Sequence, residues 1–188
     1  MSTTASNVSV GKPSISGAIS VAPIGTTLPT DATTALAAAF SNLGYVSQDG
    51  LVKGGTLTRE NLKAWGGDTV LSEITEKTTT YRFTLIESLS ADVQKFVHGD
   101  GNVSGSLASG LTVKINRIDP GEKVIAVDML LRNNAVKRIV IPRGVISDIG
   151  EVVYKDDTVV GYACTILAIA DSDGNDAYEY IKRPAAST

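Results

Sequence analysis

The stretch LTRENLKAWGGDTVLSEITEKTTTYRFTLIESLSADVQKFVHGDGNV, residues 57–103, decides the fold of this chain. It combines a Gly-Gly-Asp turn at residues 66–68, a run from 69 to 87 without Gly or Pro, and one compact helical pattern. At about 3.3 Å per residue, that run would span on the order of 60 Å. Strands of globular proteins usually have only about 3–10 residues. A β surface of this length has to pair with, or pack against, something else.

Two arrangements of residues 69–87 remain open. The run is either one strongly bent strand that serves two sheets, or two strands that meet near residues 76–78. Its second half alternates, with Tyr81, Phe83 and Leu85 on one face. Before the turn, residues 57–65 are predicted to form a strand, and the Gly-rich residues 50–58 are predicted to form a mobile projecting loop.

Residues 88–99 carry the strongest helical signal. Asp92 falls in the first turn, where the helix dipole favours a carboxylate, and Gly99 ends the pattern. His98 is interpreted as a residue of the helix end, not as a ligand or a base. An apolar stripe with helical spacing predicts the packing face, and it consists of Leu89, Val93, Phe96 and Val97.

The rest of the chain is predicted to be mostly β. Residues 16–23 open a sheet, residues 35–43 form about two helical turns, and residues 100–110 form a flexible loop. The turns predicted after this loop are Pro120-Gly121, Asn133-Asn134 and residues 142–144, 155–157 and 171–176. The strands predicted between these turns cover residues 111–117, 123–133, 135–141, 145–154, 158–171 and 177–182. We therefore expect a flexible arm (1–15), one β domain (16–182) and a C-terminal tail (183–188).

Composition argues against several classes of function. The chain has 188 residues, of which 43% are hydrophobic, and a net charge of −3. Its 17 basic residues are spread out, so it lacks the clustered Lys and Arg with which proteins grip nucleic acid. No apolar run is long enough to span a bilayer, and the N-terminus lacks a secretory pattern. We expect no membrane anchor and a protein made in a cytosol.

The sequence gives no positive sign of catalysis. Cys164 is interpreted as a small core side chain, and one Cys with one His does not make a metal site. The turn at residues 171–176 resembles the start of a calcium loop, but Asp176 stands where Gly is needed and Lys182 where Glu is needed. Phosphate-loop and nucleophile-elbow motifs are absent from the sequence. We expect no enzyme activity, no metal and no cofactor.

The only tryptophan, Trp65, has two open interpretations. It packs in the core or against its own hairpin, or it anchors a contact between subunits, where Trp is enriched. The residues expected at a subunit interface are Trp65, Asp68, Arg82 and Arg138.

Three segments carry a resemblance to a known family. GYVSQDGL (44–51), LKAWGGDTVL (62–71) and EKTTTYRFTLIESLSADVQKFVHGDGNV (76–103) occur in this order. The chain resembles the major tail tube proteins of bacteriophages with long, non-contractile tails (siphoviruses), above all those from phages of Gram-positive hosts. Any one of these pieces alone would be a weak signal, but the ordered combination is fairly specific.

The resemblance implies both fold and function. It implies two roughly orthogonal β-sheets with a helix against one edge, and a homo-hexameric ring that closes an inner β-barrel. Stacked rings would form the tail tube of the virion around a tape-measure protein, and the tube would join tail terminator and tip proteins. Phage DNA would pass through the lumen without specific binding. Some relatives carry an added immunoglobulin-like domain, which we do not expect after Thr188.

The long strands fit this picture, because unpaired strand edges must be covered and pairing between subunits covers them. The arm 1–15 and the loop 50–58 are expected to order on the next ring. The inter-ring loop consists of Gly50, Leu51, Val52, Lys53, Gly54, Gly55, Thr56, Leu57 and Thr58. The long strand and the hairpin 123–141 are expected to face the lumen. The alternatives are a β-barrel module that binds a small ligand and a tube protein of a contractile injection machine.

Overall fold

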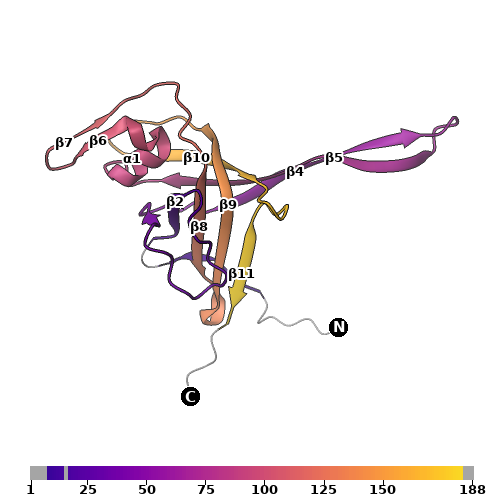
Figure 1. The fold of residues 1–188 in the computed structure, drawn as a ribbon, viewed down its shortest axis with the longest axis horizontal. Helices are drawn as coiled ribbons and strands as arrows, with labels where there is room; N and C mark the ends of the chain where they lie inside the picture. Colours follow the sequence, from indigo (N-terminus) through magenta and orange to yellow (C-terminus); the bar gives the residue numbers. More distant parts are fainter. Residues whose placement is uncertain (1–7, 15–16, 184–188) are drawn as a thin grey trace, which may run out of the picture.

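The computed structural model describes residues 8–14 and 17–183, so parts of the predicted arm and tail lie outside the described residues. The described chain is mainly β, with two sheets and one α-helix, which confirms the predicted class (Figure 1). The helix α1 covers Ala91–His98, and short 3-10 turns cover Asp100–Asn102 and Arg132–Asn134. The strands are β1 (Lys12–Pro13), β2 (Ile19–Pro23), β3 (Ser41–Asn42), β4 (Val52–Lys63), β5 (Thr69–Leu85), β6 (Val103–Ser106), β7 (Gly110–Val113), β8 (Lys123–Leu130), β9 (Val136–Ile149), β10 (Tyr162–Ile169) and β11 (Tyr178–Lys182).

The large sheet has nine strands and is antiparallel throughout. Its path is β3-β2-β8-β9-β10-β5-β4, with β1 added to β8 and β11 added to β9. In Figure 1, β8, β11 and the part of β9 beside them run across the direction of β4 and β5. The expected crossing of strand directions is therefore present, but within one continuous sheet. The sheet is open, because within the described residues β3 and β4 form its two ends.

Strand β9 turns the corner between the two directions. Along one edge, its first part pairs with β11 up to Val140, and its second part pairs with β10 from Arg143. Pro142 lies between these two partners, where its missing N–H leaves no ladder bond unmade. The predicted turn at residues 142–144 is therefore wrong, since the strand continues through the proline.

The strand that takes part in both strand directions is therefore β9, and not the run of residues 69–87. Strand β5 is one strand of 17 residues that pairs with β10 and β4, and its end at Leu85 also bridges Val46. Its inner residues Tyr81, Phe83 and Leu85 are buried beside β10, as their alternation predicts. From Thr69 to Lys77 every residue of β5 is exposed.

The predicted loop at residues 50–58 is wrong from Val52 onward, where β4 begins. All 12 residues of β4 are exposed, and they pair with β5 from Val52 opposite Arg82 to Lys63 opposite Thr69. The misleading signal was Gly54-Gly55. A side chain at Gly55 would collide with the backbone carbonyl of Thr78, so glycine marks a close approach of two strands.

Two other segments also differ from expectation. Residues 35–40 are irregular and lead into β3, because a short Ala-rich segment without a packed face does not hold a helix. Two features fix this segment against the sheet. Leu43 is fully buried, and Asp31 accepts hydrogen bonds from the amides of Thr33 and Thr34 in a turn. The expected loop at 100–110 contains β6, which forms a hairpin with β7.

The helix α1 closes one end of the core. Val93, Phe96 and Val97 are buried, and the Phe96 ring stacks on Phe83 with 6.4 Å between centroids. Leu89 does not share this packing, because it precedes the N-cap residue of the helix and is 67% exposed.

A carboxylate fixes the base of the β4–β5 hairpin to β11 and β9. Glu179 accepts one hydrogen-bonded ion pair from Lys53 at 2.8 Å and a second from Lys137 at 2.7 Å. These hydrogen bonds, that from Lys137 most strongly, lower the pKa of Glu179. Beside them, the Thr79 hydroxyl donates to Asp176 at 2.7 Å. The angle at which the hairpin leaves the body is therefore set by side chains from four strands and one turn.

The corner of β9 can be tested with Gly144→Val. An added Cβ would lie 2.8 Å from Ile125 Cδ1 and 3.0 Å from Ile166 Cγ2, so we expect overpacking to lower the free energy of unfolding by about 1–3 kcal/mol. Urea denaturation of the protomer measures it. Gly101→Val is the control, because a Cβ there would meet nothing. Equal stability of the two variants would contradict the tight corner.

The Glu179 contacts predict a pH-dependent contribution to stability. Because the folded-state pKa is lowered from 4.5, the contribution is full above this value and is lost as the pH falls through the folded-state pKa. We expect Glu179→Gln to lower the free energy of unfolding at neutral pH by about 0.5–1 kcal/mol, as for partly exposed ion pairs. Thermal denaturation across pH should show this difference shrinking below pH 4.5. Glu151→Gln, on an exposed loop, is the control, and a difference that is constant with pH would refute the assignment.

Candidate assembly site

The outer part of the β4–β5 hairpin is the most unusual surface of the molecule. We call it the arm, and it comprises residues 56–78. In Figure 1 it extends away from the rest of the chain as a two-stranded ribbon. Within the described residues, β10 pairs with β5 only as far as Thr79, so β4 and β5 have only each other beyond that point. An isolated two-stranded ribbon is at best marginally stable in water, so the arm needs a further partner.

Apolar side chains gather toward the end of the arm. Leu62 lies opposite Leu71 in the hairpin register, and the next register shift leaves Val70 as an extra residue on β5. Trp65 in the turn is entirely exposed, with a relative accessibility of 107%. We call these four residues the tip cluster. The interpretation of Trp65 as a core or hairpin-packing residue is therefore wrong, and an anchor for another chain remains.

The arm also carries like charges that face each other. Glu60 lies directly opposite Glu73, an arrangement that destabilises an antiparallel pair unless a cation lies nearby. In the turn, the carboxylate of Asp68 makes no hydrogen bond or ion pair with any described residue. The arm thus exposes apolar side chains together with four carboxylates and three basic side chains, on surface that the described residues leave uncovered.

The other predicted interface residues lie in different surroundings. Arg82 is exposed on β5, between Val52 of β4 and Thr165 of β10. Arg138 is only 5% exposed, and its guanidinium donates to both carboxylate oxygens of Asp128 and to the carbonyls of Asp31 and Thr34. A buried side chain whose donors are already hydrogen-bonded is not available to a neighbouring subunit. We therefore remove Arg138 from the residues expected at the interface.

The unpaired edges of the large sheet are a second candidate surface. Along its whole length, β4 has β5 on one side and no strand of the described chain on the other. Such an edge offers a row of backbone donors and acceptors to a strand from another chain. At the opposite end of the sheet, β3 is a short edge of two residues.

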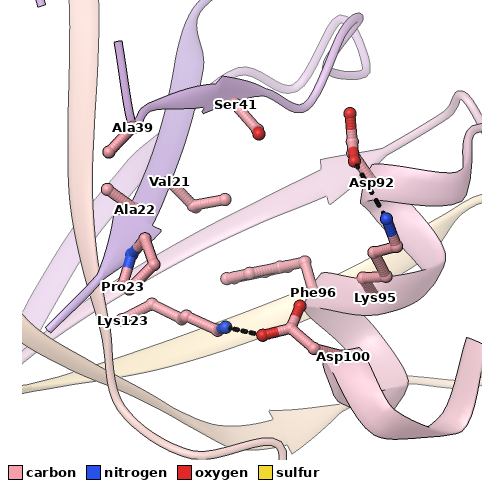
Figure 2. Close-up of a pocket in the computed structure, with 10 residues that line it drawn as sticks. All are labelled: Val21, Ala22, Pro23, Ala39, Ser41, Asp92, Lys95, Phe96, Asp100 and Lys123. Atoms are coloured by element: carbon pink, nitrogen blue, oxygen red, sulfur yellow. Dashed lines mark hydrogen bonds and ion pairs between the residues drawn. The ribbon is translucent and has the colours of Figure 1, made fainter. Parts of the chain in front are cut away.

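Three cavities in the described part of the chain are small. They measure about 200, 210 and 290 Å³, below the roughly 300–1,000 Å³ of most small-molecule sites. Figure 2 shows the first, between α1 and β2. Its two lysines already face carboxylates of the chain, since Lys123 pairs with Asp100 and Lys95 lies 3.9 Å from Asp92.

The side chains that could take part in reactions are held in packing or hydrogen-bonding roles. Burial raises the pKa of the Cys164 thiol to about 12, and burial lowers the pKa of His98, whose ring packs edge-on against Tyr162. Asp171 accepts hydrogen bonds from two amides of its own turn and from the Tyr178 hydroxyl, which lower its pKa. The part of the chain that the structure describes contains no group of three or more potential metal ligands. It also contains no helix long and apolar enough to cross a membrane.

The sequence reasoning singled out Trp65 and Asp68 but missed their apolar neighbours. Leu62, Val70 and Leu71 stand in a segment that also contains many Thr, Glu and Lys residues, so no continuous apolar pattern marks them. One signal could have revealed these residues. The strand β5 is too long for all of it to lie in the core, so the apolar residues of its outer half must be exposed.

The comparison with known families agrees with this geometry. No match was found among curated proteins. The model of the family described as phage tail tube protein matches residues 3–188, which is nearly the whole chain. A mainly β protomer with a long uncovered arm and an open sheet is suited to a repeating structural assembly. The chain belongs to the phage tail tube protein family.

Proposed function

We propose that this protein polymerises as stacked hexameric rings into the tail tube of a siphovirus, the conduit for DNA delivery. The observation that carries the proposal is the arm. At about 3.4 Å per residue, its strands extend roughly 30 Å beyond the last pairing with β10, and they expose apolar and acidic side chains. Surface of this kind is expected to be covered by other copies in the virion.

Two types of contact support a tube. The open edges of the sheet at β4 and β3 can pair between neighbours within a ring, so that six open sheets close into one barrel without free edges. The arm is long enough to leave its own ring and contact the next one. It replaces the loop 50–58 as the stacking element, since Val52–Lys63 is a strand.

The charge of the chain suits a conduit. A net charge of −3 with dispersed basic residues favours passage of DNA without specific binding. The resemblance adds a tape-measure protein within the tube, terminator and tip proteins at its ends, and assembly in the host bacterial cytoplasm. These partners belong to the proposal together with the ring.

The test is electron microscopy of the concentrated protein before and after the arm is shortened. We expect wild-type protein to form hollow tubes with a regular ring repeat. Residues 59–75 can be removed and Thr58 joined to Glu76, its cross-strand partner, through Asn-Gly. Because the shortened hairpin keeps its register and the core is untouched, we expect a folded protomer that forms no tubes.

Circular dichroism and thermal denaturation of the shortened protein show whether it is folded. A second control shortens the β6–β7 hairpin, which lies at the other end of the molecule in Figure 1. Tubes at normal yield from the arm-shortened protein would refute the stacking role. A wild-type protein that stays monomeric at every concentration, alone and with tail proteins, would refute the tube itself.

A further inference from the structure

A second cavity of about 210 Å³ lies beside β1, β2 and β8, and we call it the β8 pocket. Much of its wall is apolar, contributed by Ala18, Ile19, Val46, Leu51, Val127 and Met129. Lys12 and Gln48 also line it. Gly50 and Leu51, which the sequence placed in an inter-ring loop, belong to this pocket and not to the arm.

The size of the β8 pocket fits an aromatic side chain. An apolar protein cavity of about 150 Å³ holds benzene, so 210 Å³ has room for a larger ring such as indole. The chain has one tryptophan, and it is completely exposed at the tip of the arm. An exposed indole and an apolar pocket of matching size, which the described residues leave unfilled, are complementary surfaces.

The pocket and the tip cannot meet within one protomer. The pocket lies in the body between β1, β2 and β8, whereas the tip is roughly 30 Å beyond the last contact of β5 with β10. An occupant from this protein must therefore come from a second copy. When such a contact between two different patches is made head to tail, it repeats from copy to copy and builds rings or open filaments, as a tube requires.

Charge supports the same match. Lys12 at the pocket is exposed and makes no ion pair with a described residue, and Arg132 is exposed at the nearby end of β8. The tip carries Asp68 only three residues from Trp65, and Glu60 and Glu73 face each other further along the arm. Lys12 beside the apolar pocket thus has an opposite charge, Asp68, beside the apolar tip, while the arm as a whole carries four acidic and three basic residues.

We propose that the Trp65 indole of one copy inserts into the β8 pocket of a copy in the next ring, with Asp68 beside Lys12 of that copy. The proposal rests on the proposed tube function and names the surface that receives the arm. It assigns to the pocket an occupant from an identical chain, not a small molecule.

Crosslinking in tubes tests the position of the tip. Protein with Ala64→Cys, next to Trp65, is mixed with protein carrying Gln48→Cys at the pocket, assembled, and treated with a short bismaleimide. The native Cys164 should not react with the bismaleimide, because it is 1% exposed and burial raises its pKa to about 12. We expect a covalent dimer from the mixture in tubes and none from unassembled protein. Ala64→Cys with Val159→Cys, an exposed position on another loop, is the control and should give none.

A second, independent test measures the protein concentration at which variants of the tip and the pocket are half assembled. Trp65→Ala should raise the protein concentration needed for half assembly by about thirty-fold, as for an interface anchor, while Tyr154→Ala, another exposed aromatic, should change it little. Asp68→Lys and Lys12→Asp should each raise it about two- to five-fold, and the double variant should return toward wild type. All four residues are exposed, so folding of the protomer should be unaffected.

The outcomes separate this inference from the proposed function. If wild-type protein forms tubes but the Ala64/Gln48 mixture gives no dimer, or the charge reversal is not rescued, the β8 pocket is not the receptor and the tube function stands. If wild-type protein forms no tubes, the proposed function fails first. Binding of free indole to the protomer, with no effect of Trp65→Ala on assembly, would show a small-molecule site in place of the inter-copy contact.

Discussion

The protomer depends on the continuity of one strand, β5, across the boundary between core and solvent. Its inner residues Tyr81, Phe83 and Leu85 are buried between β10 and the rest of the core, while its outer residues have only β4 beside them. A two-stranded ribbon has little stability of its own. The arm is therefore formed before assembly only because the buried end holds its base, and the Glu179 ion pairs with Lys53 and Lys137 fix the direction in which it leaves.

The corner in β9 makes the rest of this arrangement feasible. A flat sheet of nine strands would leave both faces uncovered, whereas a sheet whose strands change direction packs one part against the other, and α1 completes the core. Pro142 falls where the partner changes from β11 to β10, and Gly144 brings the backbone close to Ile125 and Ile166. Proline and glycine usually end strands. In β9, however, Pro142 and Gly144 allow one unbroken strand to change its partner.

These positions also show what the sequence could and could not predict. The helix, the turn at residues 66–68 and the β-rich C-terminal half follow from periodicity and turn residues, which act locally. The strand at Val52, the continuation through Pro142 and the irregular course of residues 35–40 depend on neighbours far away in sequence. At the site, Trp65 and Asp68 stood out by residue type and local turn. Arg138 was misassigned because its partner Asp128 and the carbonyls it binds become neighbours only in the folded sheet.

The composition of the arm follows from two demands that conflict. Before assembly it must stay in solution without pairing at random, and the Thr, Lys and Glu residues along β4 and β5 keep it polar as a protected edge strand does. In the proposed assembly it must bind firmly, and a few buried anchors are enough, because most of the binding energy of an interface comes from a small number of side chains. Four of the six large exposed apolar residues of the arm lie in the tip cluster, an arrangement that meets both demands. The mostly polar shaft disfavours random pairing between single copies, and the repulsion between Glu60 and Glu73 weakens the free ribbon. Each contact can then remain weak alone while many of them, repeated along a tube, make a stable assembly.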